Sequence, residues 1–209
     1  GGGFVNLANG GVYSGVTTST LTLTGVVAGM NGYDYRVVVS GACAPSATSG
    51  GVNLTVNSLP VVTANPNDVT VCAGSPTSFS VTATGTTLTY QWQEDSGGGF
   101  VNLANVAPYS NVTTATLNIS DVTGLGGNRY RAVVTGTCAP AAMSTSATLT
   151  EQTAPAISVG PVASTICEGN NTSFSVTASG TTLTYQWQED SGGGFVNLAN
   201  GGVYSGVTT

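Results

Sequence analysis

Short stretches in which apolar and polar residues alternate recur along the chain, bounded by clusters of Gly, Pro, Asn, Asp and Ser. Alternation places successive side chains on opposite faces, which is the pattern of a strand with one buried face. Between residues 60 and 154 the apolar positions of these stretches are Phe79 and Val81; Leu88, Tyr90 and Trp92; Leu117 and Ile119; Tyr130, Ala132 and Val134; and Ala147 and Leu149. Several short strands at such spacing predict an all-β fold of two packed sheets.

The sequence repeats itself with a period close to 95 residues. The string GGGFVNLAN begins at Gly1, at Gly97 and at Gly192, so its spacings are 96 and 95 residues. The stretch Ser78–Asn105 recurs at Ser173–Asn200 with a single change. This period is too long for one unit of a solenoid and matches a whole small domain, so we expect a tandem array of domains.

Two prolines mark the expected domain boundaries. Pro60 and Pro155 stand at equivalent positions of the repeat, and each follows a polar stretch. We therefore expect a complete domain at 60–154, preceded by the C-terminal part of a copy at 1–59. The N-terminal part of a following copy is expected at 155–209, so that the chain is a window on a longer array.

The order of conspicuous residues in the complete domain resembles that of immunoglobulin domains. Trp92 follows the first core strand, the stretch 116–120 is Thr-Leu-Asn-Ile-Ser, and Tyr130 opens the next strand. In the immunoglobulin pattern a tryptophan on strand C lies in the core, and a tyrosine near the start of strand F forms the tyrosine corner. The resemblance implies core roles for Trp92 and Tyr130 and for their copies, Trp187 and Tyr35.

A closer similarity is to the immunoglobulin-like repeats of large secreted bacterial surface proteins. The stretches that carry it are Thr89–Gln93 (TYQWQ), Tyr109–Leu117, and Tyr35–Cys43 with its copy Tyr130–Cys138. The similarity extends over essentially the whole chain. It implies tandem immunoglobulin-like β-sandwich domains in an extracellular or cell-surface protein.

The four cysteines occupy two positions of the repeat. Cys43 is equivalent to Cys138, and Cys72 is equivalent to Cys167. An antibody-type disulfide is not expected, because Ala132 stands where strand F would carry its cysteine. We predict instead one disulfide per domain, between Cys72 and Cys138. On this prediction Cys43 and Cys167 find their partners in adjoining segments outside the chain, and the alternatives are free buried thiols or a metal site.

Such a bond would have two consequences. It implies an oxidising, extracellular compartment. It would also prevent the residues between 72 and 138 from being pulled out under load, which would make each domain a locked link.

The charge pattern excludes some partners. Charged residues make up 6% of the chain, its formal net charge is −6, and it has no Lys and no His. The basic residues are Arg36, Arg129 and Arg131, too few for the basic stripe that nucleic-acid binding requires. No apolar run approaches the length of a membrane span, so we expect neither nucleic-acid binding nor membrane insertion of this segment.

The chain offers little for catalysis. Without His or Lys, no serine has the base that a nucleophilic mechanism needs. Glu94 and Asp95, repeated as Glu189 and Asp190, are neighbours on a strand and point to opposite faces, so they do not form a glycosidase pair. We interpret them as part of a polar hairpin. Calcium near Glu94 and Asp95 is the alternative, and it would need six or more oxygen ligands. We predict no enzyme and no cofactor.

Two functional hypotheses follow. In the first, the array is the shaft of an extracellular filament or fibre whose partners are adjacent repeats and laterally associated chains. In the second, it is the stalk of a surface adhesin, with glycan binding through aromatic residues such as Phe100 and Tyr109. Near-identical copies favour the shaft. A carbohydrate-binding accessory module is a third hypothesis, and it requires a catalytic partner outside this chain.

Overall fold

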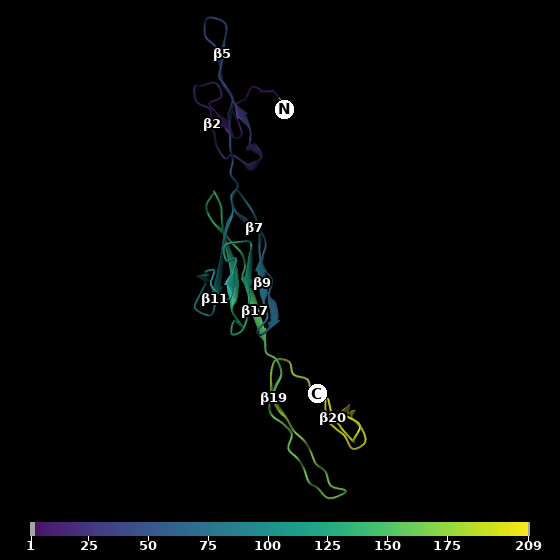
Figure 1. Ribbon diagram of the computed structural model, residues 1–209. Helices are drawn as coiled ribbons and strands as arrows, with labels where there is room; N and C mark the ends of the chain where they lie inside the picture. Colours follow the sequence, from purple (N-terminus) through teal and green to yellow (C-terminus); the bar gives the residue numbers. More distant parts are fainter. Residues whose placement is uncertain (1–2, 209) are drawn as a thin grey trace.

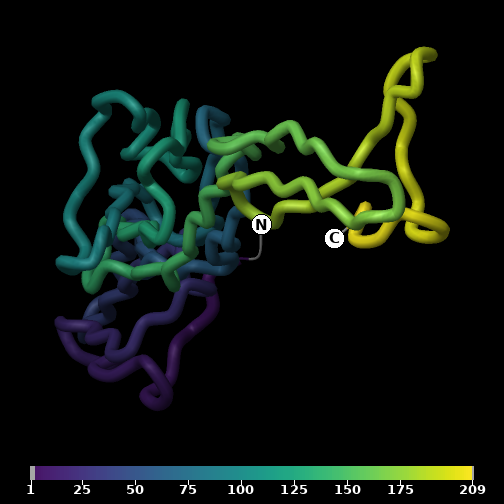
Figure 2. Tube along the Cα trace, turned by 90° about the horizontal axis from the view of Figure 1, so that it is seen from below, coloured from purple at the N-terminus to yellow at the C-terminus, as the bar shows by residue number. Residues whose placement is uncertain are grey.

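The protein is elongated, with three parts arranged end to end in a computed structural model that describes residues 3–208 (Figure 1). Residues 1, 2 and 209, which belong to the expected outer domains, lie outside this range. Viewed from below, the C-terminal part projects to one side of the other two (Figure 2). Within residues 3–208 the regular structure is strand, apart from the short 3-10 helix η1 (Ala28–Met30). No helix of this range is long and apolar enough to cross a bilayer.

The larger sheet of the central part is built on β11 (Thr89–Asp95) and β15 (Arg129–Thr135). They pair antiparallel over their full lengths. The other strands of the sheet are β8 (Val69–Cys72), β12 (Val101–Asn102), β16 (Ala142–Met143) and β17 (Ala147–Gln152). Their order is β12–β11–β15–β17–β8, with β16 beside β15. β8 runs parallel to β17, and this register places Cys72 opposite Gln152.

The opposing layer contains two smaller sheets. One has the order β13–β14–β9, and the other pairs β7 with β10. Their bounds are β7 (Val61–Ala64), β9 (Thr77–Ser80), β10 (Thr82–Thr84), β13 (Tyr109–Ser110) and β14 (Thr116–Ile119). Leu117 of β14 lies opposite Phe79 of β9, so the two apolar faces of these strands point the same way.

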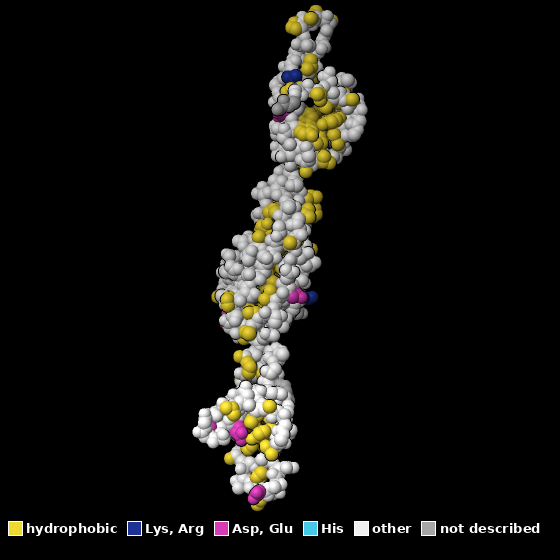
Figure 3. Space-filling model, turned by 90° about the vertical axis from the view of Figure 1, so that its right-hand side faces the viewer, with side chains coloured by type: hydrophobic (Ala, Val, Ile, Leu, Met, Phe, Trp, Pro, Cys, Tyr) yellow, Lys and Arg dark blue, Asp and Glu magenta, His cyan; other side chains and the backbone are white. Residues whose placement is uncertain are grey.

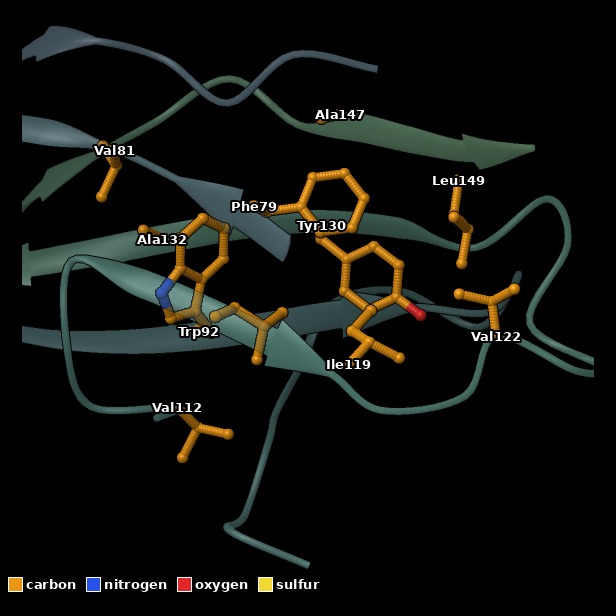
Figure 4. Close-up of a cluster of buried hydrophobic side chains, with 11 residues drawn as sticks. Phe79, Val81, Trp92, Val112, Ile119, Val122, Tyr130, Ala132, Ala147 and Leu149 are labelled. Carbon is orange, nitrogen blue, oxygen red and sulfur yellow. The ribbon is translucent and has the colours of Figure 1, made fainter. Parts of the chain in front are cut away.

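The core lies between these layers and consists of the residues that alternation along the strands places inward. Trp92 and Tyr130 are 0% exposed, and Phe79 is 1% exposed. The rings of Phe79 and Tyr130 are stacked with centroids 4.9 Å apart (Figure 4). Ala132 and Leu149 complete the same cluster. Burial of aromatic side chains of this size contributes most of the hydrophobic stabilisation of a small sandwich.

The outer parts repeat pieces of this plan, with strands that are as long as their central counterparts or shorter. The first part contains β1 (Tyr13–Ser14), β2 (Thr22–Leu23), β3 (Asp34–Tyr35), β4 (Val38–Val39), β5 (Ala47–Thr48) and β6 (Val52–Asn53). The third contains β18 (Ala156–Val159), β19 (Thr177–Ser179), β20 (Gln188–Glu189) and β21 (Val196–Asn197).

The expected core residues of the outer parts are less covered than their central copies. Tyr35 and Trp187 are half-buried, because residues 3–59 lack counterparts of β9 and β11, and residues 155–208 lack those of β15 and β17. Tyr35 lines an open apolar groove together with Leu21 and Leu23. Hydrophobic side chains are visible on this part of the surface (Figure 3).

Candidate functional site

Glu94 is the centre of a hydrogen-bonded cluster at one end of the central sheet. Its Oε1 accepts hydrogen bonds from the hydroxyls of Tyr109 and Tyr130, the latter at 2.8 Å, and from the side-chain amide of Asn128 at 2.8 Å. β11 places Glu94 directly opposite Tyr130 of β15, and β13 supplies Tyr109. The cluster therefore joins the two sheets of the sandwich.

The same contacts recur in the outer parts. The hydroxyls of Tyr13 and Tyr35 lie 3.3 Å apart, as do those of Tyr109 and Tyr130. In the third part Tyr204 donates a hydrogen bond of 2.8 Å to Glu189. Each of the two contacts of the central domain, tyrosine with tyrosine and tyrosine with glutamate, therefore recurs in one outer part, so both belong to the repeat.

Burial and this carboxylate raise the pKa values of the tyrosines. Desolvation, followed by the hydrogen bond to Glu94, raises the pKa of Tyr109 to about 12. Burial raises the pKa of Tyr130 further, with the hydrogen bonds to Tyr109 and Glu94 as additional causes. Both hydroxyls are therefore neutral donors at physiological pH. Tyr130 departs from the tyrosine corner of immunoglobulin domains, since its hydroxyl bonds to a side chain rather than to backbone upstream.

Asp95 organises the hairpin that follows β11. Its Oδ1 accepts the backbone N–H groups of Gly97 at 2.8 Å and Gly99 at 2.9 Å, and its Oδ2 pairs with Arg129. The two N–H groups and then the guanidinium hold the pKa of this carboxyl below its usual range. Asp190 repeats the arrangement with Gly192 and Gly194. The Gly-rich run therefore folds around an acidic side chain.

A cation that bound at this loop would compete with protein hydrogen-bond donors for the carboxylate oxygens of Glu94 and Asp95. Both oxygens of Asp95 and Oε1 of Glu94 already accept hydrogen bonds from protein donors. Across residues 3–208, no group of three or more His, Cys, Asp or Glu side chains is placed to hold a metal ion. Calcium bound near Glu94 and Asp95 would have to displace the guanidinium of Arg129 or the tyrosine hydroxyls.

The ring of Phe100, which follows the Gly-rich run after β11, is covered on one face by an arginine side chain. Arg131 lies 3.9 Å from the centroid of Phe100, and its Nε donates to Gln93 Oε1 at 2.8 Å. Arg36 lies 4.0 Å from the centroid of Phe4 in the first part. Such stacking is a cation–π contact and occupies one face of the ring. The arginines of this chain thus serve contacts within the repeat.

The junctions between parts share one geometry. Ser58 donates its backbone N–H to Thr86 Oγ1 at 2.9 Å, and its carbonyl oxygen accepts the backbone N–H of Thr86 at 3.2 Å. At the next junction Thr153 and Thr181 make the same two hydrogen bonds, at 2.9 Å and 3.1 Å. The first linker is thereby fastened to the loop between β10 and β11, and the second to the equivalent loop between β19 and β20.

A glycine at each junction allows this close approach. A Cβ on Gly85 would lie 2.9 Å from the carbonyl oxygen of Leu59 and 2.9 Å from Cα of Pro60. Gly180 has the same relation to Ala154 and Pro155. Both glycines have φ values above +140°, a conformation that L-residues rarely adopt. The boundary prolines were predicted from the sequence, whereas these glycine contacts were not, although Gly85 and Gly180 lie in the longest repeated stretch.

The prediction of a Cys72–Cys138 disulfide is wrong for this structure. Cys72, Cys138, Cys43 and Cys167 are all free thiols. Cys72 ends β8 beside Gln152, whereas Cys138 follows the opposite end of β15 and contacts Asn57. From the strand register the two cysteines are on the order of 40 Å apart, and a disulfide needs a Cα separation of about 4.4–6.8 Å. The domain is therefore not locked internally between residues 72 and 138.

Comparison with known proteins identifies the architecture. An I-band fragment of titin superposes with a TM-score of 0.62 and 18% identity, covering 94% of this chain and 68% of the fragment. A three-Ig structure of titin domains with Glu-to-Ala mutations gives 0.63 and 16%, with the same coverage. These similarities confirm the predicted all-β, tandem immunoglobulin-like fold.

Sequence comparison adds one distant relative. Endoglucanase C of Cellulomonas fimi is 30% identical over 141 residues, which are 66% of this chain and 12% of that enzyme. The chain thus spans a small part of this relative, and no family model matches it. The solved structures that it resembles are immunoglobulin domains in tandem. The chain is an array of immunoglobulin-like β-sandwich domains in which adjacent repeats contact one another.

Proposed function

We propose that this chain is a segment of the shaft of an extracellular filament or fibre. The observation that carries the proposal is the repeated junction, in which Ser58–Thr86 and Thr153–Thr181 make equivalent hydrogen bonds. Equivalent junctions set similar relations between successive domains, and a regular shaft requires this. The extracellular location rests on the resemblance to repeats of secreted surface proteins.

Lateral association of such shafts would use the apolar surface of the strands. Val101 of the edge strand β12 is 63% exposed, and Val106, in the loop between β12 and β13, is 68% exposed. With 6% charged residues in the chain, little repulsion opposes contact between neighbouring copies. Exposed β-branched residues beside a sheet edge favour association with another chain.

The alternative is the stalk of a cell-surface adhesin. The observation in its favour is the repeated arginine–phenylalanine pair, Arg131 on Phe100 and Arg36 on Phe4, which presents the same side-chain pattern in successive repeats. Phe195, the third copy of this phenylalanine, is 72% exposed. A glycan-binding array would present such rings at regular spacing.

Electron microscopy of the native material at neutral pH separates these two functions. The shaft predicts straight fibres with a regular axial repeat and several chains in cross-section. Single flexible strings one domain wide would contradict it and would favour the stalk. Binding of the purified chain to a glycan array, abolished by Phe100→Ala, would support the stalk independently.

A further inference from the structure

Each repeat carries its cysteines at opposite ends. In the central domain Cys72 ends β8 next to Gln152, the residue before the linker that leaves the domain. Its side chain is exposed, while Val69 and Val71 of the same strand are more buried. Cys138 lies at the other end, where its Sγ is 3.5 Å from the carbonyl oxygen of Asn57, just before the linker that enters. One cysteine thus faces each junction.

In successive repeats, the Cys72 position of one domain and the Cys138 position of the next lie at the same junction. Asn57 and Gln152 are equivalent residues, and the contacts that fasten the linkers after them are the same at both junctions. Residues 136–138 pack on the junction through a 3.0 Å hydrogen bond from Thr137 N–H to Thr86 carbonyl oxygen. Where the repeat continues past residue 209, the equivalent of Cys138 is therefore placed against the carbonyl oxygen of Gln152.

That same oxygen is already next to Cys72. The carbonyl of Gln152 accepts the backbone N–H of Ala73, the residue after Cys72, at 2.8 Å. A sulfur 3.5 Å from the corresponding oxygen, as Cys138 is from Asn57, approaches the same carbonyl. Cys72 of one repeat and the Cys138 equivalent of the next therefore lie next to the same carbonyl group. This proximity is compatible with the Cα separation of about 4.4–6.8 Å that a disulfide requires.

We propose that disulfides link successive repeats, from the Cys72 position of one domain to the Cys138 position of the next. Two thiols lose two protons and two electrons as the S–S bond forms. A small disulfide oxidant such as oxidised glutathione accepts both and is reduced to two thiols. On this proposal no two of the four cysteines of this chain are partners of one another, in keeping with the four free thiols.

Such a bond clamps the junction rather than the domain. It closes over the linker between Gln152 and Pro155 and joins the two domains at a second point, so it restricts bending between them. The proposal does not depend on whether the array is a shaft or a stalk. If the disulfide is not found, the fibre hypothesis still stands, and if no fibre is found, the disulfide proposal still stands.

The test extends the full chain by one designed segment. Residue 209 is equivalent to Thr114, so appending a second copy of residues 115–154 completes the last domain and adds a copy of Cys138. The extended protein is oxidised with glutathione disulfide, alkylated and cleaved at its arginines without reduction. Mass spectrometry should find the peptide 37–129, which contains Cys72, joined to the C-terminal peptide with the added cysteine. Thiol titration should show two thiols fewer than in the reduced protein.

Matched variants identify the cysteine within that peptide. Cys72→Ser should abolish the cross-link, whereas Cys43→Ser should leave it intact, since both cysteines lie in the peptide 37–129. Both side chains are exposed, so neither change should disturb folding, as circular dichroism would verify. A bond between Cys72 and Cys138, or full thiol reactivity after oxidation of the folded protein, would overturn the proposal.

Discussion

At the scale of single residues, Glu94 is the acceptor that the hydrogen bonds of Tyr109, Tyr130 and Asn128 share. Glu94→Ala would leave the hydroxyl of the fully buried Tyr130 and the amide of Asn128 without their acceptor. An unsatisfied buried donor costs about 1–3 kcal/mol, so we expect a loss of about 2 kcal/mol in the free energy of unfolding. Urea unfolding followed by tryptophan fluorescence measures it. Glu168→Ala, at an exposed position, should change stability by less than about 0.5 kcal/mol.

The raised pKa of Tyr109, in the same cluster, predicts that the protein loses stability at alkaline pH. Tyr109 has a folded pKa of about 12, above the value of about 10 for an unfolded tyrosine. Its contribution to stability is therefore complete below pH 10 and is lost as the pH rises through 12. We expect Tyr109→Phe to reduce the fall in unfolding free energy between pH 9 and 12. Equal slopes for the two proteins would show that this hydroxyl is not responsible.

The sequence revealed core residues much better than it revealed this cluster. Trp92 and Tyr130 could be assigned to the core because alternation along one strand is enough to show which side chains point inward. Glu94 lies on the same face of β11 as Trp92, but a charged residue at the end of an apolar alternation carries no core signal, and its role depends on the register of β11 against β15 and on Tyr109 from the other sheet. That register joins residues 34 or more positions apart, for which alternation carries no signal.

At the scale of elements, the hairpin after β11 depends on the ionised form of Asp95. Its folded pKa is depressed, so its contribution is present above the unfolded value of about 3.9 and is lost as the pH falls through the folded value. We expect unfolding free energy to decline below pH 4. Asp95→Asn should be less stable at pH 7, because it loses the ion pair with Arg129, and should decline less on acidification. The opposite ranking of the two slopes would refute this account.

Strand pairing also explains the error about the cysteines. Positions 72 and 138 are the only cysteines of the complete repeat, and the sequence shows how far apart they are along the chain but not at which end of a strand each lies. The parallel pairing of β8 with β17 decides this, because it places Cys72 beside Gln152. Parallel pairs join segments remote in sequence and leave no turn signal between them. The two ends of the domain could be told apart only once this pairing was known.

At the scale of the whole molecule, the end-to-end arrangement depends on glycine at two junctions. A Cβ at Gly85 or Gly180 would press on the linker backbone within 3.1 Å and would require an unfavourable φ. We expect the double variant Gly85→Ala/Gly180→Ala to lose the hydrogen bonds that fasten the linkers, since the loop must move away. The central domain should stay folded, because the added methyl groups meet the linker backbone and the flexible ends of Leu88 and Leu183, and none of these belongs to the buried cluster around Trp92.

Small-angle X-ray scattering measures this change directly. The wild-type chain should show one well-defined maximum dimension, whereas the double variant should show a broader distance distribution from freely bending junctions. Gly98→Ala is the matched control, because its added Cβ meets nothing within 4 Å and its φ is not positive. Scattering from this control should coincide with that of the wild type. If the double variant also coincides with the wild type, the linkers are held by something other than the contacts at Thr86 and Thr181, and the regular shaft would lose its structural basis.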